Sequence, residues 1–183
     1  MSSSLPADYR PPASPALGTG PKDPEPTKDY GFSHTMIRIK DPRVTLPFYM
    51  DTLGMTLVHR MDSEGGKFTN YFLLYPQSKV PEDEKERRTW MWSQQGIVEL
   101  CHNWGTEDDA SFAGYKSGNE AEHKGFGHLC VFVDDLQKAV DRWTQQGVRF
   151  KKRPEEGTMR HIAFLLDPDG YWIEVIAKGG RSV

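Results

Sequence analysis

The alternation of apolar and polar positions predicts a β-α-β-β-β order in the first half of the chain. Residues 34–40 alternate in the manner of a half-buried strand. Asp41 and Pro42 then provide a helix start, with an acidic N-cap and a proline at the first helical position. Apolar residues recur at helical spacing as far as Gly54, where we expect the helix to end. Further strands are expected over 55–61 and 67–75, and residues 89–103 are expected to hold the fourth strand and its lead-in.

The second half of the chain repeats this order. Residues 128–133 read as a strand, and Asp134 and Asp135 cap a helix whose apolar positions have helical spacing up to Gly147. Three further strands are expected over 148–151, 162–166 and 171–176, and the turn 167–170 joins the last two into a hairpin.

These patterns divide the chain into five segments. Residues 1–28 hold seven of the thirteen prolines and few large apolar side chains, so we expect a disordered or extended N-terminal arm. The first βαβββ module is expected over 29–103, a linker over 104–126, the second module over 127–177 and a tail over 178–183. The charged segment 77–89 is expected to be a surface excursion, with its charge run 82–88 in a solvated loop.

The overall composition excludes several classes of protein. With 27% charged residues and a net charge of -3, the chain is not expected to bind nucleic acid. No apolar run approaches the roughly 18–20 residues that span a bilayer, so no membrane partner is expected. Two cysteines do not make a disulfide framework in a chain of 183 residues, and this favours a reducing, cytoplasmic location.

The two modules share one histidine and one glutamate at matching places. His34 opens the first module and His128 the second, while Glu99 and Glu174 lie in the last strand of each. Imidazole and carboxylate groups are ligands for divalent metals, so the repeat predicts one metal site with pseudo-twofold symmetry. Each residue also has an ordinary interpretation, as a strand-end histidine or a solvent-facing glutamate. The shared register favours metal ligation for all four together.

Several stretches of the chain carry longer motifs: His34-Thr35-Met36-Ile37-Arg38 with Leu53-Gly54-Met55, Glu99 to Asp109, Gly125-Phe126-Gly127-His128, and Asp167 to Glu174. Together these motifs resemble the glyoxalase I family of the vicinal oxygen chelate superfamily, and the resemblance covers roughly residues 27–177. The resemblance implies an α+β fold in which two βαβββ modules form a curved mixed sheet that cups a metal. It also implies isomerisation of the methylglyoxal–glutathione hemithioacetal to S-D-lactoylglutathione.

The resemblance assigns roles to individual residues. The metal ligands would be His34, Glu99, His128 and Glu174. Glu174 would be the main proton shuttle, and Glu99 would share that duty. Glutathione is implied as cosubstrate, and its contacts would be Arg38, Asn103, Lys124, Lys152, Thr158 and Met159. Cationic side chains suit a ligand that carries two carboxylates.

Zinc is favoured as the metal, with nickel as the alternative, because the long insertion and the N-terminal arm resemble the longer, zinc-using class. The family also implies a homodimer with shared active sites. Lys124 stands where many relatives have arginine, and Thr158 where some have lysine, so the grip on glutathione is expected to be looser.

Two other functions are compatible with the same scaffold. An iron(II) extradiol dioxygenase would need two histidines and one carboxylate, and the fourth ligand, Glu99, argues against it. A non-catalytic small-molecule-binding protein would not need the four ligands. Fold alone does not decide among these functions.

Overall fold

The structure, a computed structural model, describes residues 18, 20 and 24–179. The chain divides into two compact units, residues 1–31 and 32–183. The described part of the first unit contains a short 3-10 helix, η1 (Glu25–Thr27), and an ion pair of 2.8 Å between Lys28 and Glu25. Most of the expected arm over 1–28, and all but residues 178 and 179 of the expected tail, lie outside the described residues.

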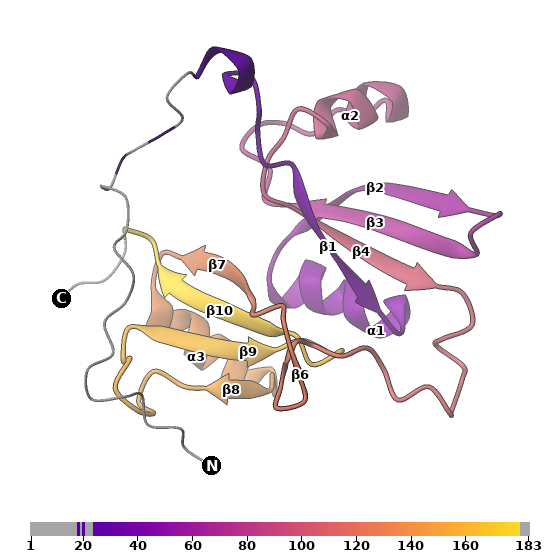
Figure 1. Cartoon of the computed structure of the whole chain (residues 1–183). Coiled ribbons are helices and arrows are strands. Elements are labelled where there is room, and N and C mark those ends of the chain that lie inside the picture. Colours follow the sequence, from indigo (N-terminus) through magenta and orange to yellow (C-terminus); the bar gives the residue numbers. More distant parts are fainter. Residues whose placement is uncertain (1–17, 19, 21–23, 180–183) are drawn as a thin grey trace, which may run out of the picture. The chain divides into compact units, whose positions relative to one another are not determined.

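The second unit begins with a mixed four-stranded sheet in the order β1-β4-β3-β2 (Figure 1). Strand β1 (His34–Ile39) runs parallel to β4 (Ile97–Asn103). Strand β3 (Phe68–Leu74) runs antiparallel to β4 and to β2 (Thr56–Ser63). The strands predicted from alternation are therefore present, and the fourth begins later than Thr89.

The first helix, α1 (Pro42–Pro47), starts as its sequence predicts, because the Asp41 side chain accepts a hydrogen bond of 2.8 Å from the Arg43 backbone N–H. Pro47 has no backbone N–H to continue the ladder, and the chain widens directly after it into the π-helical turn η2 (Phe48–Thr52). Gly54 then adopts φ 79°, which ends the helical segment.

The prediction of a solvated loop over the charge run 82–88 was wrong, because a helix, α2 (Glu84–Met91), begins within it. Asp83 caps it by accepting from the Glu86 backbone N–H at 2.9 Å. Met91 is buried, and Arg87 donates to the Val58 carbonyl of β2 at 3.0 Å. A charged sequence of good helix formers thus becomes ordered by one apolar anchor and one long side chain that reaches the sheet.

The second sheet repeats the topology of the first in the order β7-β10-β9-β8. Strand β7 (Leu129–Val133) runs parallel to β10 (Trp172–Ala177), and β9 (Ile162–Leu166) is antiparallel to β10 and β8 (Phe150–Lys152). Helix α3 (Leu136–Gln145) connects β7 to β8 and is capped by Asp135, as predicted.

The segment expected to link the modules carries a small hairpin of its own, β5 (Asn119–Glu120) and β6 (His123–Lys124). Gly118 precedes it with φ 84°, and a Cβ at this position would lie 2.2 Å from the Phe126 carbonyl oxygen. Only glycine fits this close approach of two backbone segments.

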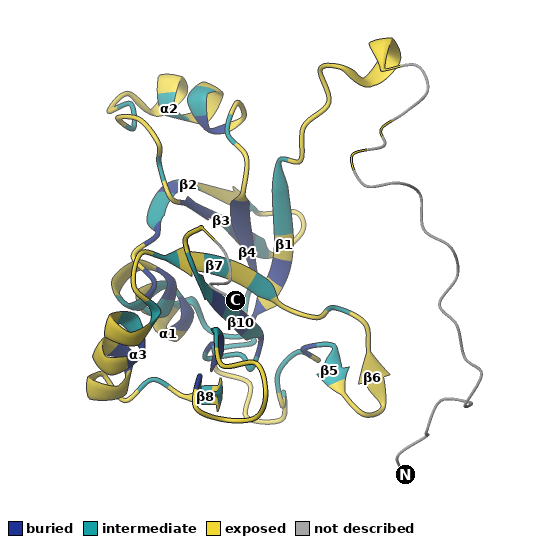
Figure 2. Cartoon of the chain, turned by 90° about the vertical axis from the view of Figure 1, so that its left-hand side faces the viewer, coloured by how far each residue is buried: buried dark blue, intermediate teal, exposed yellow. Residues whose placement is uncertain are grey.

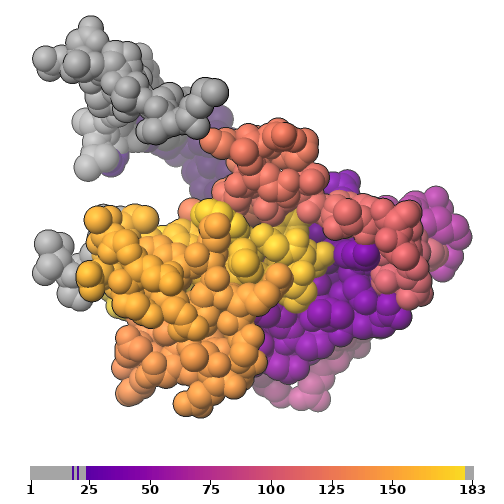
Figure 3. Space-filling model, turned by 90° about the horizontal axis from the view of Figure 1, so that it is seen from below, coloured from indigo at the N-terminus to yellow at the C-terminus, as the bar shows by residue number. Residues whose placement is uncertain are grey.

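The two modules share one hydrophobic core. Helix α3 packs against β9 and β10, and side chains of α3 and of the α1–η2 segment belong to a single buried cluster (Figure 2). Trp143 on α3 donates to the Thr52 carbonyl of η2 at 3.0 Å, and Arg142 donates to the Asp51 carbonyl at 2.8 Å. Figure 3 shows the surfaces of the two modules in direct contact.

The predicted α+β fold of two βαβββ modules is confirmed, with two four-stranded mixed sheets in place of one continuous sheet. Strands β1 and β7 end their sheets, so within the described chain each has a strand neighbour on one side only. Cys130 on β7 is exposed, whereas Cys101 on β4 is buried. No described helix has the length and apolar character needed to cross a membrane.

Candidate metal centre

The first predicted ligand pair comes together across β1 and β4. Met36 is the register partner of Glu99, and His34 lies two residues before Met36, so His34 and Glu99 share one face of the sheet. Their Nε2 and Oε2 atoms are 3.0 Å apart. Glu99 is only 8% exposed in a strand that is otherwise mostly apolar. A buried carboxylate in such surroundings needs a partner.

The second predicted pair has the same construction. Cys130 on β7 is the register partner of Glu174 on β10, and His128 lies two residues before Cys130. The His128 Nε2 and Glu174 Oε2 atoms are again 3.0 Å apart. The repeat that the sequence predicts is therefore also a repeat of side-chain geometry.

The repeat extends to an aromatic residue that the sequence pattern did not single out. Phe72 on β3 pairs with Glu99, and Phe164 on β9 pairs with Glu174. Each ring meets the histidine of its own module edge-on, with ring centroids 6.4 Å apart at His34 and 5.3 Å apart at His128. Each imidazole is thus held between a carboxylate and an aromatic edge, which restricts its orientation.

The separation within each pair suits ligation of one ion by both side chains. Imidazole nitrogen and carboxylate oxygen each bind zinc at about 2.0–2.2 Å, so two such atoms reach one ion only when they lie less than about 4.3 Å apart. The observed 3.0 Å in both pairs lies within this limit. The donor set, imidazole nitrogen and carboxylate oxygen, also suits a divalent metal.

The structure brings the four predicted ligands together as two pairs and not as one group of four. Among residues 18, 20 and 24–179, no three histidine, cysteine, aspartate or glutamate side chains gather in a way that would hold a metal ion. The described chain therefore presents two separate histidine–glutamate pairs, one on each sheet, which are called the candidate half-sites below.

The two carboxylates differ in their polar neighbours. Asn70 Nδ2 on β3 donates a hydrogen bond to Glu99 Oε1, and the Asn70 side chain is buried. Beside Glu174 lies the thiol of Cys130. The sequence interpretation missed Asn70, although a single amide within the aromatic and apolar strand Phe68–Leu74 was a visible signal.

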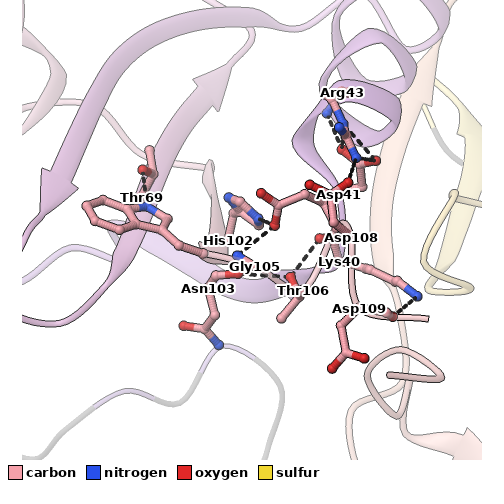
Figure 4. Close-up of polar contacts among 12 residues, drawn as sticks. Lys40, Asp41, Arg43, Thr69, His102, Asn103, Gly105, Thr106, Asp108 and Asp109 are labelled. Carbon is pink, nitrogen blue, oxygen red and sulfur yellow. Dashed lines mark hydrogen bonds and ion pairs between the residues drawn. The ribbon is translucent and has the colours of Figure 1, made fainter. Parts of the chain in front are cut away.

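The loop after β4 positions Asn103, a predicted substrate contact. His102 Nε2 and Glu107 Oε2 are 2.7 Å apart, and Glu107 also accepts from the Gly105 backbone N–H at 2.8 Å. Thr106 donates to the Lys40 carbonyl at 2.7 Å (Figure 4). These bonds tie the loop to the end of β1, and the Asn103 amide donates to the Tyr115 hydroxyl at 2.7 Å.

The other predicted substrate contacts lie on separate elements. Arg38 is exposed on β1, on the same face as His34. Lys124 is exposed on β6, and Thr158 and Met159 are exposed in the loop between β8 and β9. Lys152 Nζ donates to the backbone carbonyls of Arg153, Met159 and Ile162 and so braces that loop from within the chain.

A groove of about 500 Å³ lies along the free edge of β7. Its walls are mainly apolar and include Phe32, Thr35, Ile97, Val131 and Phe132. Phe132 is 62% exposed. An apolar surface beside a free strand edge is typical of a surface that another chain covers.

Comparison with known proteins agrees with this description. The model of the Glyoxalase/Bleomycin resistance protein/Dioxygenase superfamily matches residues 31–175. The chain is 45% identical to a lactoylglutathione lyase of Schizosaccharomyces pombe over 82% of its own length and 46% of that protein. It is 46% identical to a lactoylglutathione lyase of Pseudomonas putida, with coverage of 86% and 90%.

The solved structures include glyoxalase I of Leishmania major, described as trypanothione-dependent. It matches with a TM-score of 0.61 and 28% identity, over 82% of this chain and 88% of that one. The chain spans about half the length of the two yeast relatives that it matches, and most of the length of the bacterial ones.

Proposed function

We propose that this chain, which belongs to the Glyoxalase/Bleomycin resistance protein/Dioxygenase superfamily, is a lactoylglutathione lyase. It isomerises the hemithioacetal of methylglyoxal and glutathione to S-D-lactoylglutathione, which detoxifies methylglyoxal. The observation that carries the proposal is the pair of matched half-sites, each with an imidazole nitrogen and a carboxylate oxygen 3.0 Å apart. Identities of 44% and 46% to bacterial lactoylglutathione lyases over most of both chains support it.

A complete site forms between two subunits of a homodimer. His34 and Glu99 of one subunit meet His128 and Glu174 of the partner subunit, and the symmetric contact forms a second site. Two observations support this arrangement. The described part of one chain does not bring three candidate metal ligands together, and β1 and β7 have free edges next to an apolar groove. In a homodimer with twofold symmetry, the first half-site of each subunit meets the second half-site of the other, so the same contact forms two complete sites.

His34 and Glu99 of one subunit, with His128 and Glu174 of the partner subunit, would hold a divalent metal ion. When bound, the metal would act as a Lewis acid on the hemithioacetal. We propose zinc, with nickel as the alternative, because imidazole and carboxylate ligands suit both ions.

The chemical step is a proton transfer by a glutamate of the site. Glu174 takes the proton from the carbon that bears sulfur, and the electron pair moves onto the neighbouring carbonyl oxygen to give an enediolate. Glu174 then returns the proton to the adjacent carbon, and the hydroxyl proton passes between the two oxygens. The product is an α-hydroxy thioester, with atoms and electrons conserved. Phe72 and Phe164 beside the two histidines limit the access of water to the carboxylates.

Glutathione binding requires partners for two carboxylates. Arg38 lies on the same face as His34, and Asn103 is held by the loop after β4. We assign Lys124, Thr158 and Met159 to the rim of the site, and Lys152 acts by bracing the 153–161 loop. Both cysteines are free thiols, which agrees with a reducing compartment, and we assign the enzyme to the cytoplasm.

The proposal is tested on the purified full-length chain. Metal content is measured, the metal is removed with a chelator, and the apoprotein is refilled with zinc or nickel in separate samples. Formation of the thioester from methylglyoxal and glutathione is followed by absorbance. We expect one ion per chain, no turnover after chelation and recovery with a divalent metal. Absence of thioester formation with every metal, or oxygen uptake with iron(II) and a catechol, contradicts the proposal.

A further inference from the structure

The carboxylates of the two half-sites are not equivalent, although the backbone repeat makes their positions equivalent. Glu99 uses both oxygens: Oε2 faces His34 and Oε1 accepts from Asn70 Nδ2. Within the described part of the chain, the polar side chains that interact with Glu174 are His128 and the weak donor Cys130. The Glu174 side chain is 21% exposed, against 11% for Glu99.

Asn70 occupies a place that an aliphatic residue takes in the other module. Asn70 pairs with Cys101, two residues after Glu99, and Ile162 pairs with Ile176, two residues after Glu174. Both Asn70 and Ile162 are buried. The same position of the repeat therefore carries an amide in one sheet and a branched hydrocarbon in the other.

Asn70 also lowers the stability of the folded state. Its Oδ1 is buried without a hydrogen-bond partner among the described residues, and a buried acceptor left unpaired destabilises the folded state. An aliphatic side chain would avoid this penalty, as Ile162 does. Among the residues that the structure describes, the hydrogen bond from Nδ2 to Glu99 is the one polar contact of the Asn70 side chain, and it offsets this cost.

We propose that Asn70 is a positioning residue that holds Glu99 as a fixed ligand and thereby leaves proton transfer to Glu174. This inference rests on the proposed function and deepens it. A carboxylate whose two oxygens are both engaged cannot rotate toward a substrate carbon without breaking one of its bonds. Among the described residues, the polar side chains beside Glu174 are His128 and Cys130, and a thiol is a weak donor, so Glu174 is free to move. The pseudo-symmetric site therefore has one restrained and one mobile carboxylate.

The first experiment observes the Asn70 amide directly. The chain contains three asparagines, Asn70, Asn103 and Asn119, so protein labelled with nitrogen-15 asparagine gives three side-chain amide signals. Asn103→Ser and Asn119→Ser identify two of them. We expect the remaining signal to exchange slowly with solvent, to shift in Glu99→Gln and to stay in place in Glu174→Gln. A signal that does not respond to Glu99→Gln overturns the proposal.

The second experiment measures coupling between Asn70 and the two carboxylates. Glu99→Gln and Glu174→Gln are each combined with Asn70→Leu, which removes the amide and keeps the volume. In the parent, Glu174→Gln is expected to lower kcat by about 100-fold or more. In the Asn70→Leu background, Glu99 gains mobility and takes over part of the proton transfer. The loss of kcat caused by Glu174→Gln is then expected to be about tenfold smaller than in the parent. Asn70→Leu alone is expected to weaken metal binding about tenfold in a chelator competition.

Ile162→Val is the matched control, because it alters the equivalent buried position without touching a polar contact of Glu174. It should leave the effect of Glu174→Gln and the metal affinity unchanged. Additive effects of Asn70→Leu and Glu174→Gln in a folded, active protein overturn the role of Asn70 while leaving the proposed function intact. Loss of all turnover in the parent under every metal condition contradicts the proposed function, and the amide signal still tests the contact between Asn70 and Glu99.

Discussion

The Tyr49 hydroxyl in the first module donates a hydrogen bond of 3.0 Å to the Asp167 carboxylate in the second. Asp167 is fully buried and also accepts from the Tyr171 backbone N–H at 2.8 Å. Burial raises the pKa of Asp167 to about 7, and the neighbouring Asp169 carboxylate adds to the effect. This hydrogen bond holds the turn between β9 and β10 of the second module against η2 of the first module.

The raised pKa of Asp167 makes stability depend on pH. Between about pH 4 and pH 7 the folded state keeps a proton that the unfolded chain has lost, so the free energy of unfolding falls as pH rises. The loss amounts to at most about 4 kcal/mol and is complete above the folded pKa. Asp167→Asn should flatten this slope in urea titrations at several pH values. Asp134→Asn, at an exposed position, is the control, and an unchanged slope in Asp167→Asn would contradict the assignment.

Replacement of Glu174 tests the proton-transfer step. Glu174→Gln retains the size of the side chain, but an amide does not accept the proton, so we expect kcat to fall by about 100-fold or more with little change in the melting temperature. Steady-state kinetics on the hemithioacetal and circular dichroism measure the two quantities. Activity within a few-fold of the parent would exclude Glu174 as the base.

A mixture of two inactive variants tests whether subunits share each site. His34→Ala damages the first half-site and Glu174→Gln damages the second. If the halves come from different subunits, each mixed dimer contains one intact site, and random mixing restores about a quarter of the parent activity. We would measure turnover after dissociation and reassociation of an equal mixture. Activity no higher than the mean of the separate variants would place each site within one chain.

The shared core predicts that the two modules unfold together. Trp143 is 2% exposed, packs in the cluster common to both modules and donates to the Thr52 carbonyl. Trp143→Ala should lower the free energy of unfolding by about 3–5 kcal/mol while keeping a single transition. Trp92→Ala, at a position 51% exposed, should cost about 1 kcal/mol or less. Two separate transitions in denaturant would show that the modules are independent.

The local pattern of residues in the sequence was sufficient to predict most of the fold. Alternation, the caps at Asp41 and Asp135 and the glycines at 54 and 147 predicted both βαβββ modules, because these signals act between residues close in sequence. Helix α2 was missed, because its charged sequence is held by one buried residue, Met91, and by a contact with β2. Neither feature has a periodic signal.

The repeat in the amino-acid sequence was enough to predict His34, Glu99, His128 and Glu174 as the candidate site residues, because equivalent strand positions place their side chains on equivalent faces. It could not predict that these residues form two separate pairs, or that Asn70 contacts Glu99 and not Glu174. Which face a side chain takes follows from the period of its own strand, whereas its partner across the sheet depends on strand register and packing between distant segments.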